Sequence, residues 1–363
     1  MALSKIQSDS MSNAAIQSNR NLIINGAMKI HQRGNQVTAG GTSVYFLDRW
    51  NIYHNTAAAA NLQQSTVVPT GQGFSNSLLV DCTTADTSVA SSDAAVLRQV
   101  IEGQNLQKLA YGTSSAKSIT LSFWVRSTKT GTYISNIYHA DATARSQSHQ
   151  YTISQADTWE YKTLTFSGDT SIAADNDNAA TFYVQWGLMA GSDLSSGTLN
   201  TTWQNSTDVN RFVGQVNFFD STSNNFYLTG VQLEIGDVAT PFEHEDTGTT
   251  LRKCQRYYAK SWSQGSAVNT NPGVIGAACV GNANRAFGNV FWPVTMRTAP
   301  TVTWYSGSSG TVNKWRNASS GTDITAAAAI AGIGESGYGF VLSSGIDAIT
   351  DTLQGHYQAV AEM

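Results

Sequence analysis

Hydrophobic and polar residues alternate in short runs along this chain, and the periodicity of amphipathic helices is nearly absent. Residues 118–126 read Ser-Ile-Thr-Leu-Ser-Phe-Trp-Val-Arg, and residues 161–166, 181–186 and 226–233 are similarly rich in β-branched and aromatic side chains. A period of two places one face of a strand against a core and the other face in water. The pattern therefore predicts antiparallel strands.

Turn-forming residues separate these runs. Ser167-Gly168-Asp169 and the Asp/Asn stretch 175–178 are examples, and strand-like runs resume at 288–294 and 300–305. The last residues, 356–363, have the composition of a final strand. Many short strands separated by Gly, Asn and Asp are typical of antiparallel β-sandwiches, so we predict an all-β fold.

A change of charge at residues 241–262 marks a predicted domain boundary. Basic residues are scarce in this chain, yet four of them lie within nine positions: Arg252, Lys253, Arg256 and Lys260. They follow the acidic residues Glu243, Glu245 and Asp246. We interpret this segment as a connector whose opposite charges pair with each other. A patch that binds an anionic sugar or phosphate is the alternative.

The composition excludes several classes of protein. Charged residues make up only 13% of the chain, against about 25% in an average protein. The 21 basic and 25 acidic residues give a net charge of -4, which argues against a nucleic-acid partner. The hydrophobic content of 41%, with 10% aromatic residues, excludes a disordered chain. No apolar run reaches the roughly 18 residues of a membrane span, so we expect no membrane insertion.

The cysteines and the N-terminus indicate where the protein is made. Cys82, Cys254 and Cys279 are an odd number and lack CxxC spacing, as expected for free thiols in a reducing cytoplasm. Residues 1–20 are polar and lack the apolar stretch of a signal peptide. We therefore expect no secretion by that route.

Motifs of catalysis and metal binding are absent from the sequence. The six histidines form no HxH or HExxH pair, and no GxSxG, P-loop or GxGxxG motif occurs. Asp175 and Asp177 alternate with Asn176 and Asn178, but the glycine and later glutamate of a calcium loop are missing. A solvated turn is the preferred interpretation of that segment. We predict no catalytic residues, no metal and no cofactor.

Aromatic residues are the best candidates for ligand binding, because sugar rings stack on them while polar side chains supply hydrogen bonds. Trp262, Tyr305 and Trp315 lie beside Ser-, Gly- and Asn-rich segments and are the candidates for exposure. A buried structural role is nevertheless favoured for each of them. A further set lies inside apolar runs and is predicted to belong to the core: Trp124, Trp186 and Trp292.

Several ordered segments carry a resemblance to a known group of proteins. They are Asn21–Met28 with Gln32-Arg33-Gly34 and Phe46–Trp50; Phe226–Gly236 with Thr240–Glu243; Cys254-Gln255-Arg256-Tyr257-Tyr258; and Met296–Val302 with Tyr357–Glu362. Together they resemble the modular tail-fibre or head-fibre proteins of tailed bacteriophages. In that group the first set opens a jelly roll similar to carbohydrate-binding modules, the second closes it, and the third leads into a C-terminal β-domain.

The resemblance implies a domain organisation. Residues 1–20 would be an N-terminal anchor segment and residues 21–246 a carbohydrate-binding-like jelly roll. Residues 247–261 would be a connector and residues 262–363 a distal β-sandwich. Thus the predicted fold class is all-β, with two antiparallel, jelly-roll-like β-sandwich domains and a short anchoring segment.

The same resemblance bears on calcium. Carbohydrate-binding jelly rolls often open with Asn-Gly-Asp/Glu and close with paired Asp, which commonly hold calcium. Here Ala27 follows Asn25-Gly26, and Thr229-Gly230 occupies the closing position. These departures argue against a calcium site like theirs, and sugar binding by this domain is implied by the resemblance alone.

The function implied is that of a non-enzymatic structural fibre of a phage virion, made in the host cytoplasm, that attaches to the host surface through polysaccharide. The implied partners are other copies in a homotrimer, phage tail or capsid proteins, and host surface polysaccharide. Virion anchoring would use the apolar residues of the first segment: Leu3, Ile6, Met11 and Ile16. The alternatives are a capsid-bound head fibre or decoration protein, a glycan depolymerase, and a bacterial carbohydrate-binding module.

Overall fold

A computed structural model of the chain describes residues 19–38, 41–268, 279–280, 286–325, 329–342 and 352–363. The chain divides into two compact units. Unit 1 contains the described residues through Lys29, Asn35–Tyr45 and Trp50–Glu245. Unit 2 contains Ile30–Gly34, Phe46–Arg49 and Asp246–Met363. Two short segments near the N-terminus therefore belong to unit 2, although the residues around them belong to unit 1.

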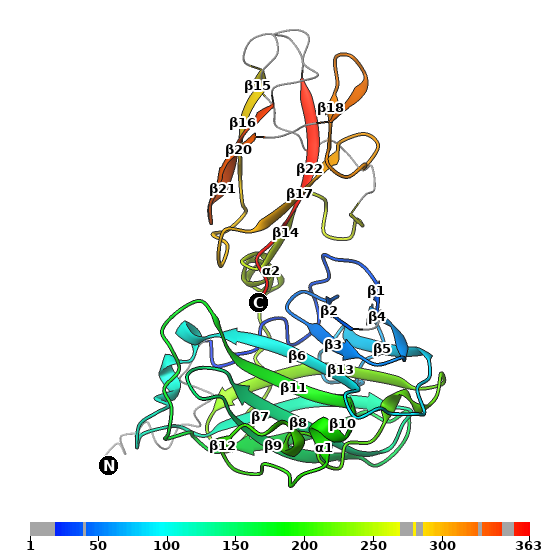
Figure 1. Ribbon diagram of the computed structural model, residues 1–363, viewed down its shortest axis with the longest axis vertical. Helices are drawn as coiled ribbons and strands as arrows, with labels where there is room; N and C mark the ends of the chain where they lie inside the picture. Colours follow the sequence, from blue (N-terminus) through cyan, green and yellow to red (C-terminus); the bar gives the residue numbers. More distant parts are fainter. Residues whose placement is uncertain (1–18, 39–40, 269–278, 281–285, 326–328, 343–351) are drawn as a thin grey trace, which may run out of the picture. The chain divides into compact units, whose positions relative to one another are not determined.

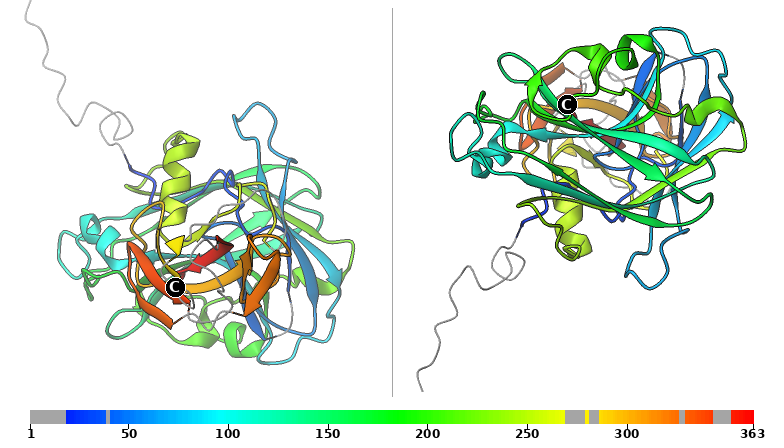
Figure 2. Two further views of the ribbon diagram at one scale, coloured as in Figure 1. Left: turned by 90° about the horizontal axis from the view of Figure 1, so that it is seen from above. Right: turned by 90° about the horizontal axis from the view of Figure 1, so that it is seen from below.

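Unit 1 is a sandwich of two antiparallel sheets (Figure 1). One sheet has six strands in the order β1 (Gln36–Val37), β4 (Ala59–Ser65), β5 (Ser77–Thr84), β13 (Asn225–Ile235), β7 (Ile119–Ser127) and β10 (Glu160–Phe166). The other has seven, in the order β12 (Gln204–Asn205), β9 (Arg145–Ile153), β8 (Gly131–His139), β11 (Ala180–Ala190), β6 (Ala94–Glu102), β3 (Asn51–Asn55) and β2 (Thr42–Tyr45). In the view from below in Figure 2, green and cyan strands of unit 1 cross the picture.

The core of unit 1 lies between these sheets and is rich in aromatic rings. Trp186 of β11 is fully buried, with its ring centroid 5.5 Å from that of Trp50 and 5.8 Å from that of Phe123. Trp186 is thus a core residue, as predicted. The prediction for Trp124 is wrong, because its neighbours Phe123 and Val125 face the core and alternation turns Trp124 to the outer face, where it is half-buried.

Among the described residues of unit 1, helical turns are short and lie in the connections between strands. They are η3 (Gly103–Asn105), η4 (Gln107–Leu109), α1 (Ser192–Ser195), η5 (Asp208–Asn210) and η6 (Phe218–Asp220). No helix in the described part of the chain is long and apolar enough to cross a membrane.

The described residues of unit 2 form two smaller antiparallel sheets and one helix, α2 (Thr247–Gln255). The five-stranded sheet has the order β14 (Tyr258–Lys260), β22 (Leu353–Val360), β18 (Lys314–Asn317) and β19 (Thr322–Thr325), with β17 (Thr301–Ser306) also paired to β22. The four-stranded sheet has the order β15 (Cys279–Val280), β16 (Ala286–Phe291), β21 (Gly337–Leu342) and β20 (Ala329–Ile333). A core that includes Trp292, Trp304, Trp315 and Phe340 holds unit 2 together. The predicted all-β class is confirmed.

The segment predicted as a connector, 247–261, is instead an integral part of unit 2. Its first residues form α2, which begins where the Asp246 carboxylate accepts a hydrogen bond from the Thr249 amide. Its last residues form β14, which pairs with β22. Lys260 is buried, and its ammonium donates to the Gln264 carbonyl at 3.1 Å, so it does not belong to an exposed basic patch.

A buried charged cluster explains why two N-terminal segments belong to unit 2. The Glu362 carboxylate pairs with Arg33 at 2.8 Å and also with Arg49. Asp48 accepts two hydrogen bonds from Gln32, from its amide at 2.7 Å and its side chain at 2.5 Å. The two guanidinium groups also lie over aromatic rings, Arg33 over Tyr258 and Arg49 over Tyr257. Three of the ordered sequence segments thus meet in one place, because their charged residues neutralise one another away from water.

Candidate functional site

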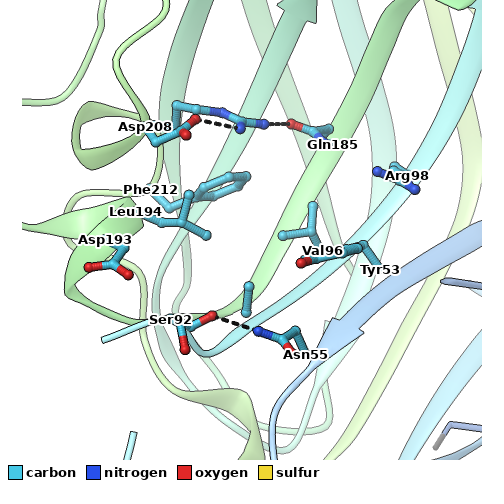
Figure 3. Close-up of a pocket in the computed structure, with 12 residues that line it drawn as sticks. Tyr53, Asn55, Ser92, Val96, Arg98, Gln185, Asp193, Leu194, Asp208 and Phe212 are labelled. Carbon is cyan, nitrogen blue, oxygen red and sulfur yellow. Dashed lines mark hydrogen bonds and ion pairs between the residues drawn. The ribbon is translucent and has the colours of Figure 1, made fainter. Parts of the chain in front are cut away.

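A pocket of about 380 Å³ lies on the outer face of the seven-stranded sheet of unit 1 (Figure 3). The strands contribute Tyr53 and Asn55 from β3, Ala94, Val96 and Arg98 from β6, and Gln185 from β11; the connections contribute Ser92, Asp193, Leu194, Asp208, Arg211 and Phe212. The pocket therefore depends on three adjacent strands and on three connections: those that contain α1 and η5, on either side of β12, and the connection between β5 and β6.

Strand alternation and register bring the strand residues of the pocket together. In β6, Ala95 and Leu97 are fully buried, whereas Arg98 is partly exposed. The antiparallel register places Tyr53 opposite Val96 and Arg98 opposite Gln185. Side chains opposite each other on adjacent strands share one face of the sheet. The same face therefore presents aromatic, cationic and amide groups side by side.

The middle of the pocket is apolar. Val96 and Phe212 are buried in a small cluster against which Leu194 packs, and Figure 3 shows these three side chains between the polar groups. Gly187 permits this packing, because a Cβ there would lie 2.8 Å from Cδ1 of Phe212. The pocket thus has an apolar surface that can contact the C–H groups of a ligand.

Hydrogen bonds hold the two pocket arginines in place. Arg98 donates from Nε to Asn51 Oδ1 at 2.8 Å and from Nη2 to Ser43 Oγ at 3.0 Å. Arg211 donates from Nη2 to Gln185 Oε1 at 2.6 Å and from Nη1 to Asp208 Oδ1 at 3.1 Å. Fixed donors lose less conformational entropy when a ligand binds than mobile ones do.

The charges of the two arginines are balanced differently. Arg211 forms a salt bridge with Asp208, whose side chain is 70% exposed. Arg98 has no carboxylate partner in the described part of the chain. Burial lowers the pKa of its guanidinium group from the ordinary value. An arginine nevertheless remains charged in proteins. The pocket therefore offers a half-buried cation to a ligand.

Tyrosines extend the site along the same face. The Arg98 guanidinium carbon lies 5.6 Å from the ring centroid of Tyr53 and 5.4 Å from that of Tyr183. Tyr183 in turn contacts Tyr138 edge-on at 5.8 Å, and the Arg211 guanidinium lies over the Tyr138 ring. Rings interleaved with hydrogen-bond donors suit a ligand that has both C–H faces and hydroxyl groups. Among the described residues, no group of three or more His, Cys, Asp or Glu side chains is placed to hold a metal.

The ligand-binding candidates from the sequence lie elsewhere, in unit 2, and their side chains are buried. Trp262, Tyr305 and Trp315 are 3%, 6% and 3% exposed. Trp262 stacks on His356, and Trp315 stacks on Trp304. Their Ser- and Gly-rich neighbours are turns, but the rings occupy inward positions in or next to strands. The favoured alternative, a buried structural role, agrees with these positions. Trp315 also lines a cavity of about 400 Å³, and ligand binding by the three residues stays a prediction.

Two other predictions concern virion anchoring and calcium binding. The anchoring candidates Leu3, Ile6, Met11 and Ile16 lie outside the described residues. Asp175 and Asp177 lie in the connection between β10 and β11, where the Asp177 carboxylate accepts a hydrogen bond from the Ala179 amide.

The outer-face site as a whole does not follow from the sequence, although part of its signal is present there. Within the predicted strand 181–186, Tyr183 and Gln185 alternate with Phe182, Val184 and Trp186. This alternation identifies Tyr183 and Gln185 as outward residues. Their proximity to Arg98 and Tyr53 depends on the sheet order β11-β6-β3, which no local pattern contains.

Comparisons with known proteins identify no family for this chain. No protein-family model and no curated protein sequence matches it. Remote structural likenesses exist. The enzymatically active domain of tailspike protein 4 from bacteriophage CBA120 has 14% identity and a TM-score of 0.31 over 60% of this chain and 22% of that chain. The module TmCBM61, solved with β-1,4-galactotriose, has 10% identity and a TM-score of 0.30 over 60% of this chain and 100% of that chain. A family 11 carbohydrate-binding module from Clostridium thermocellum, solved with a mixed-linked tetrasaccharide, has 12% identity and a TM-score of 0.26 over 57% of this chain and 99% of that chain.

Proposed function

We propose that unit 1 binds a glycan on the outer face of its seven-stranded sheet, and that the protein is a non-enzymatic fibre of a phage virion that attaches to host surface polysaccharide. The observation that carries the binding proposal is the pocket with an apolar middle, Val96, Leu194 and Phe212, beside the fixed polar groups of Arg98 and Gln185. A sugar ring needs both kinds of contact at once.

The size and shape of the site support this ligand class. The pocket volume of about 380 Å³ falls within the roughly 300–1,000 Å³ of small-molecule sites. The row of Tyr53, Tyr183 and Tyr138 continues beyond the pocket, so a chain of several sugar units can follow the sheet. Several copies in one particle would add their affinities through avidity, which suits a site of weak individual contacts.

The proposed place of the protein is the virion, with tail or capsid proteins and further copies in a homotrimer as partners. The ordered sequence segments support this proposal. Electron microscopy of labelled particles tests the location, and light scattering of the purified protein tests the trimer. A protein absent from the particle, or a monomer at all concentrations, would contradict these parts of the proposal.

The binding experiment uses the full-length protein and an array of bacterial capsular and O-antigen polysaccharides. Tyr53→Ala removes the exposed ring, Tyr53→Phe retains it, and Arg98→Gln removes the cation. The matched control is Val238→Ala, a position that is 75% exposed and outside the pocket. We expect at least a tenfold loss with Tyr53→Ala and with Arg98→Gln, and none with the control. Unchanged binding in both variants would refute the site, and release of new reducing ends would refute the non-enzymatic role.

A further inference from the structure

A second hollow of about 500 Å³ lies on the outer face of the other, six-stranded sheet of unit 1. It is lined by residues from three strands, β7, β10 and β13, and from the chain segments 72–74 and 239–244: Gln72, Phe74, Trp124, Tyr161, Gly230, Ala239, Thr240, Pro241, Phe242 and His244. None of these residues takes part in the first site.

Aromatic rings form two walls of this hollow. Trp124 and Tyr161 are opposite each other in the register of β7 and β10, and their ring centroids lie 5.3 Å apart. Tyr161 is 43% exposed. On the other side Phe74, Phe242 and His244 contact one another with centroids 5.0–5.2 Å apart. Ring contacts within each wall hold the aromatic side chains in place.

Gly230 allows the two walls to approach. It lies at an irregularity in the pairing of β13 with β7 and has a φ of 60°, in the left-handed region that favours glycine. A Cβ at this position would lie 2.6 Å from Cζ of Phe74 and 3.1 Å from Cδ1 of Trp124. The absence of a side chain at Gly230 therefore lets one ring from each wall pack over the same point of the backbone.

The lining of the hollow is uncharged. It contains no Asp, Glu, Lys or Arg, and burial, together with Lys29, lowers the pKa of His244. Hydrogen-bonding capacity is present in Gln72 and Tyr161, whereas the Thr240 hydroxyl already donates to the Glu234 carboxylate at 2.6 Å. The Tyr161 hydroxyl has no hydrogen-bond partner among the residues described, so it is available to a ligand. The hollow thus differs from the first site, which contains two arginines.

The surroundings of the hollow argue against a protein partner. The same face of the sheet carries exposed Thr163 and Thr165 on β10, and partly exposed Asn61 and Gln63 on β4. These residues make that part of the face polar. Past Trp124 on the other side, the rings of Tyr227 and Trp159 contact each other next to the ion pair of Arg126 and Asp157. A stable protein interface buries roughly 800 Å² on each partner around an apolar centre. Rigid aromatic rings with uncharged polar neighbours match the C–H faces and hydroxyl groups of a sugar.

We propose that this hollow is a second carbohydrate-binding site, which takes uncharged hexose units stacked on Trp124 and Tyr161. Because its residues differ from those of the first site, it can bind sugar whether or not the first site does. Two sites on opposite faces of unit 1 would let one molecule contact two glycan chains, or two parts of one chain.

The test measures binding of the full-length protein to a neutral mixed-linked β-glucan, a neutral galactan and an anionic polygalacturonate by affinity electrophoresis. We expect Trp124→Ala and Tyr161→Ala each to weaken binding of a neutral glycan by at least tenfold, and Trp124→Phe to restore part of it. The control Val37→Ala, at a position on β1 that is 64% exposed and outside both sites, should leave this binding within twofold. A salt concentration of 0.5 M should not change the binding, because no charge is involved.

Several outcomes would overturn the proposal. They are the absence of binding to both neutral glycans, equal binding by Trp124→Ala and wild type, and tighter binding of polygalacturonate than of both neutral glycans. If Trp124→Ala instead abolishes self-association seen by light scattering, the hollow is an interface between copies of the chain. Circular dichroism checks folding, and Tyr161→Ala, an exposed change on an edge strand, remains informative if Trp124→Ala unfolds.

Discussion

Replacing Glu362 by Gln tests whether the buried charged cluster holds the N-terminal segments within unit 2. The Glu362 side chain is 5% exposed and pairs with Arg33 and Arg49, which are 9% and 1% exposed. Glutamine keeps the shape of the side chain but removes the negative charge between two guanidinium groups. The two buried guanidinium groups would then lose the carboxylate that they share, whereas their ring contacts with Tyr258 and Tyr257 would remain.

The expected cost follows from this burial. Breaking a buried ion pair by removing one partner costs about 3–5 kcal/mol, because the remaining charge is left uncompensated in a poorly hydrated place. A typical domain has only about 5–15 kcal/mol of stability. The Glu362→Gln change therefore removes a large fraction of the stability of unit 2. The matched control is Asp157→Asn, which breaks an exposed pair with Arg126 and should cost less than about 1 kcal/mol.

Hydrogen exchange measured by mass spectrometry resolves the effect by unit, and urea unfolding gives its free energy. In Glu362→Gln we expect faster exchange of the β22 amides and of residues 46–49, with β11 amides of unit 1 unchanged. In Asp157→Asn both regions should exchange as in the wild type. A free energy of unfolding within about 1 kcal/mol of the wild-type value would refute the assignment of a stabilising role to this cluster.

Two further predictions concern pH and thiol chemistry. Burial lowers the pKa of His54 and of His149 in unit 1 below 6.5, so the unfolded state takes up protons that the folded state does not; the free energy of unfolding of unit 1 should therefore fall below pH 6.5, by up to about 1.4 kcal/mol per pH unit for each histidine. Urea titrations between pH 5 and pH 7.5 measure how the free energy of unfolding changes with pH. The His54→Phe change should reduce this slope by the contribution of one proton taken up on unfolding, and an unchanged slope would show that His54 does not take up that proton. Burial, with a smaller effect of Asp81, raises the pKa of Cys82 to about 11, and burial also raises that of Cys254. Both should resist a thiol reagent at pH 7 until the protein unfolds, and rapid labelling of either one in the folded protein, located by peptide mapping, would contradict their burial.

The local sequence pattern was sufficient to predict the positions of the main strands, but not always which face of a strand is buried. The predicted runs 118–126, 161–166, 181–186 and 226–233 coincide closely with β7, β10, β11 and β13, because a period of two is a property of a single strand. Trp124 shows the limit of this approach. An aromatic residue inside an apolar run can face either side, and only the pairing with β10 and β13 identifies its side as the outer one.

The amino-acid sequence alone established the all-β class, the positions of the main strands and the burial of Trp186, since each depends on local periodicity and hydrophobicity. Tertiary structure decided the rest. The N-terminal segments 30–34 and 46–49 belong to unit 2 because buried charges near them pair with Glu362, more than 300 positions away. The pocket residues Tyr53, Arg98 and Gln185 meet only through strand order and register. Such contacts join residues far apart in the chain, and their free energy depends on exclusion of water by the assembled fold.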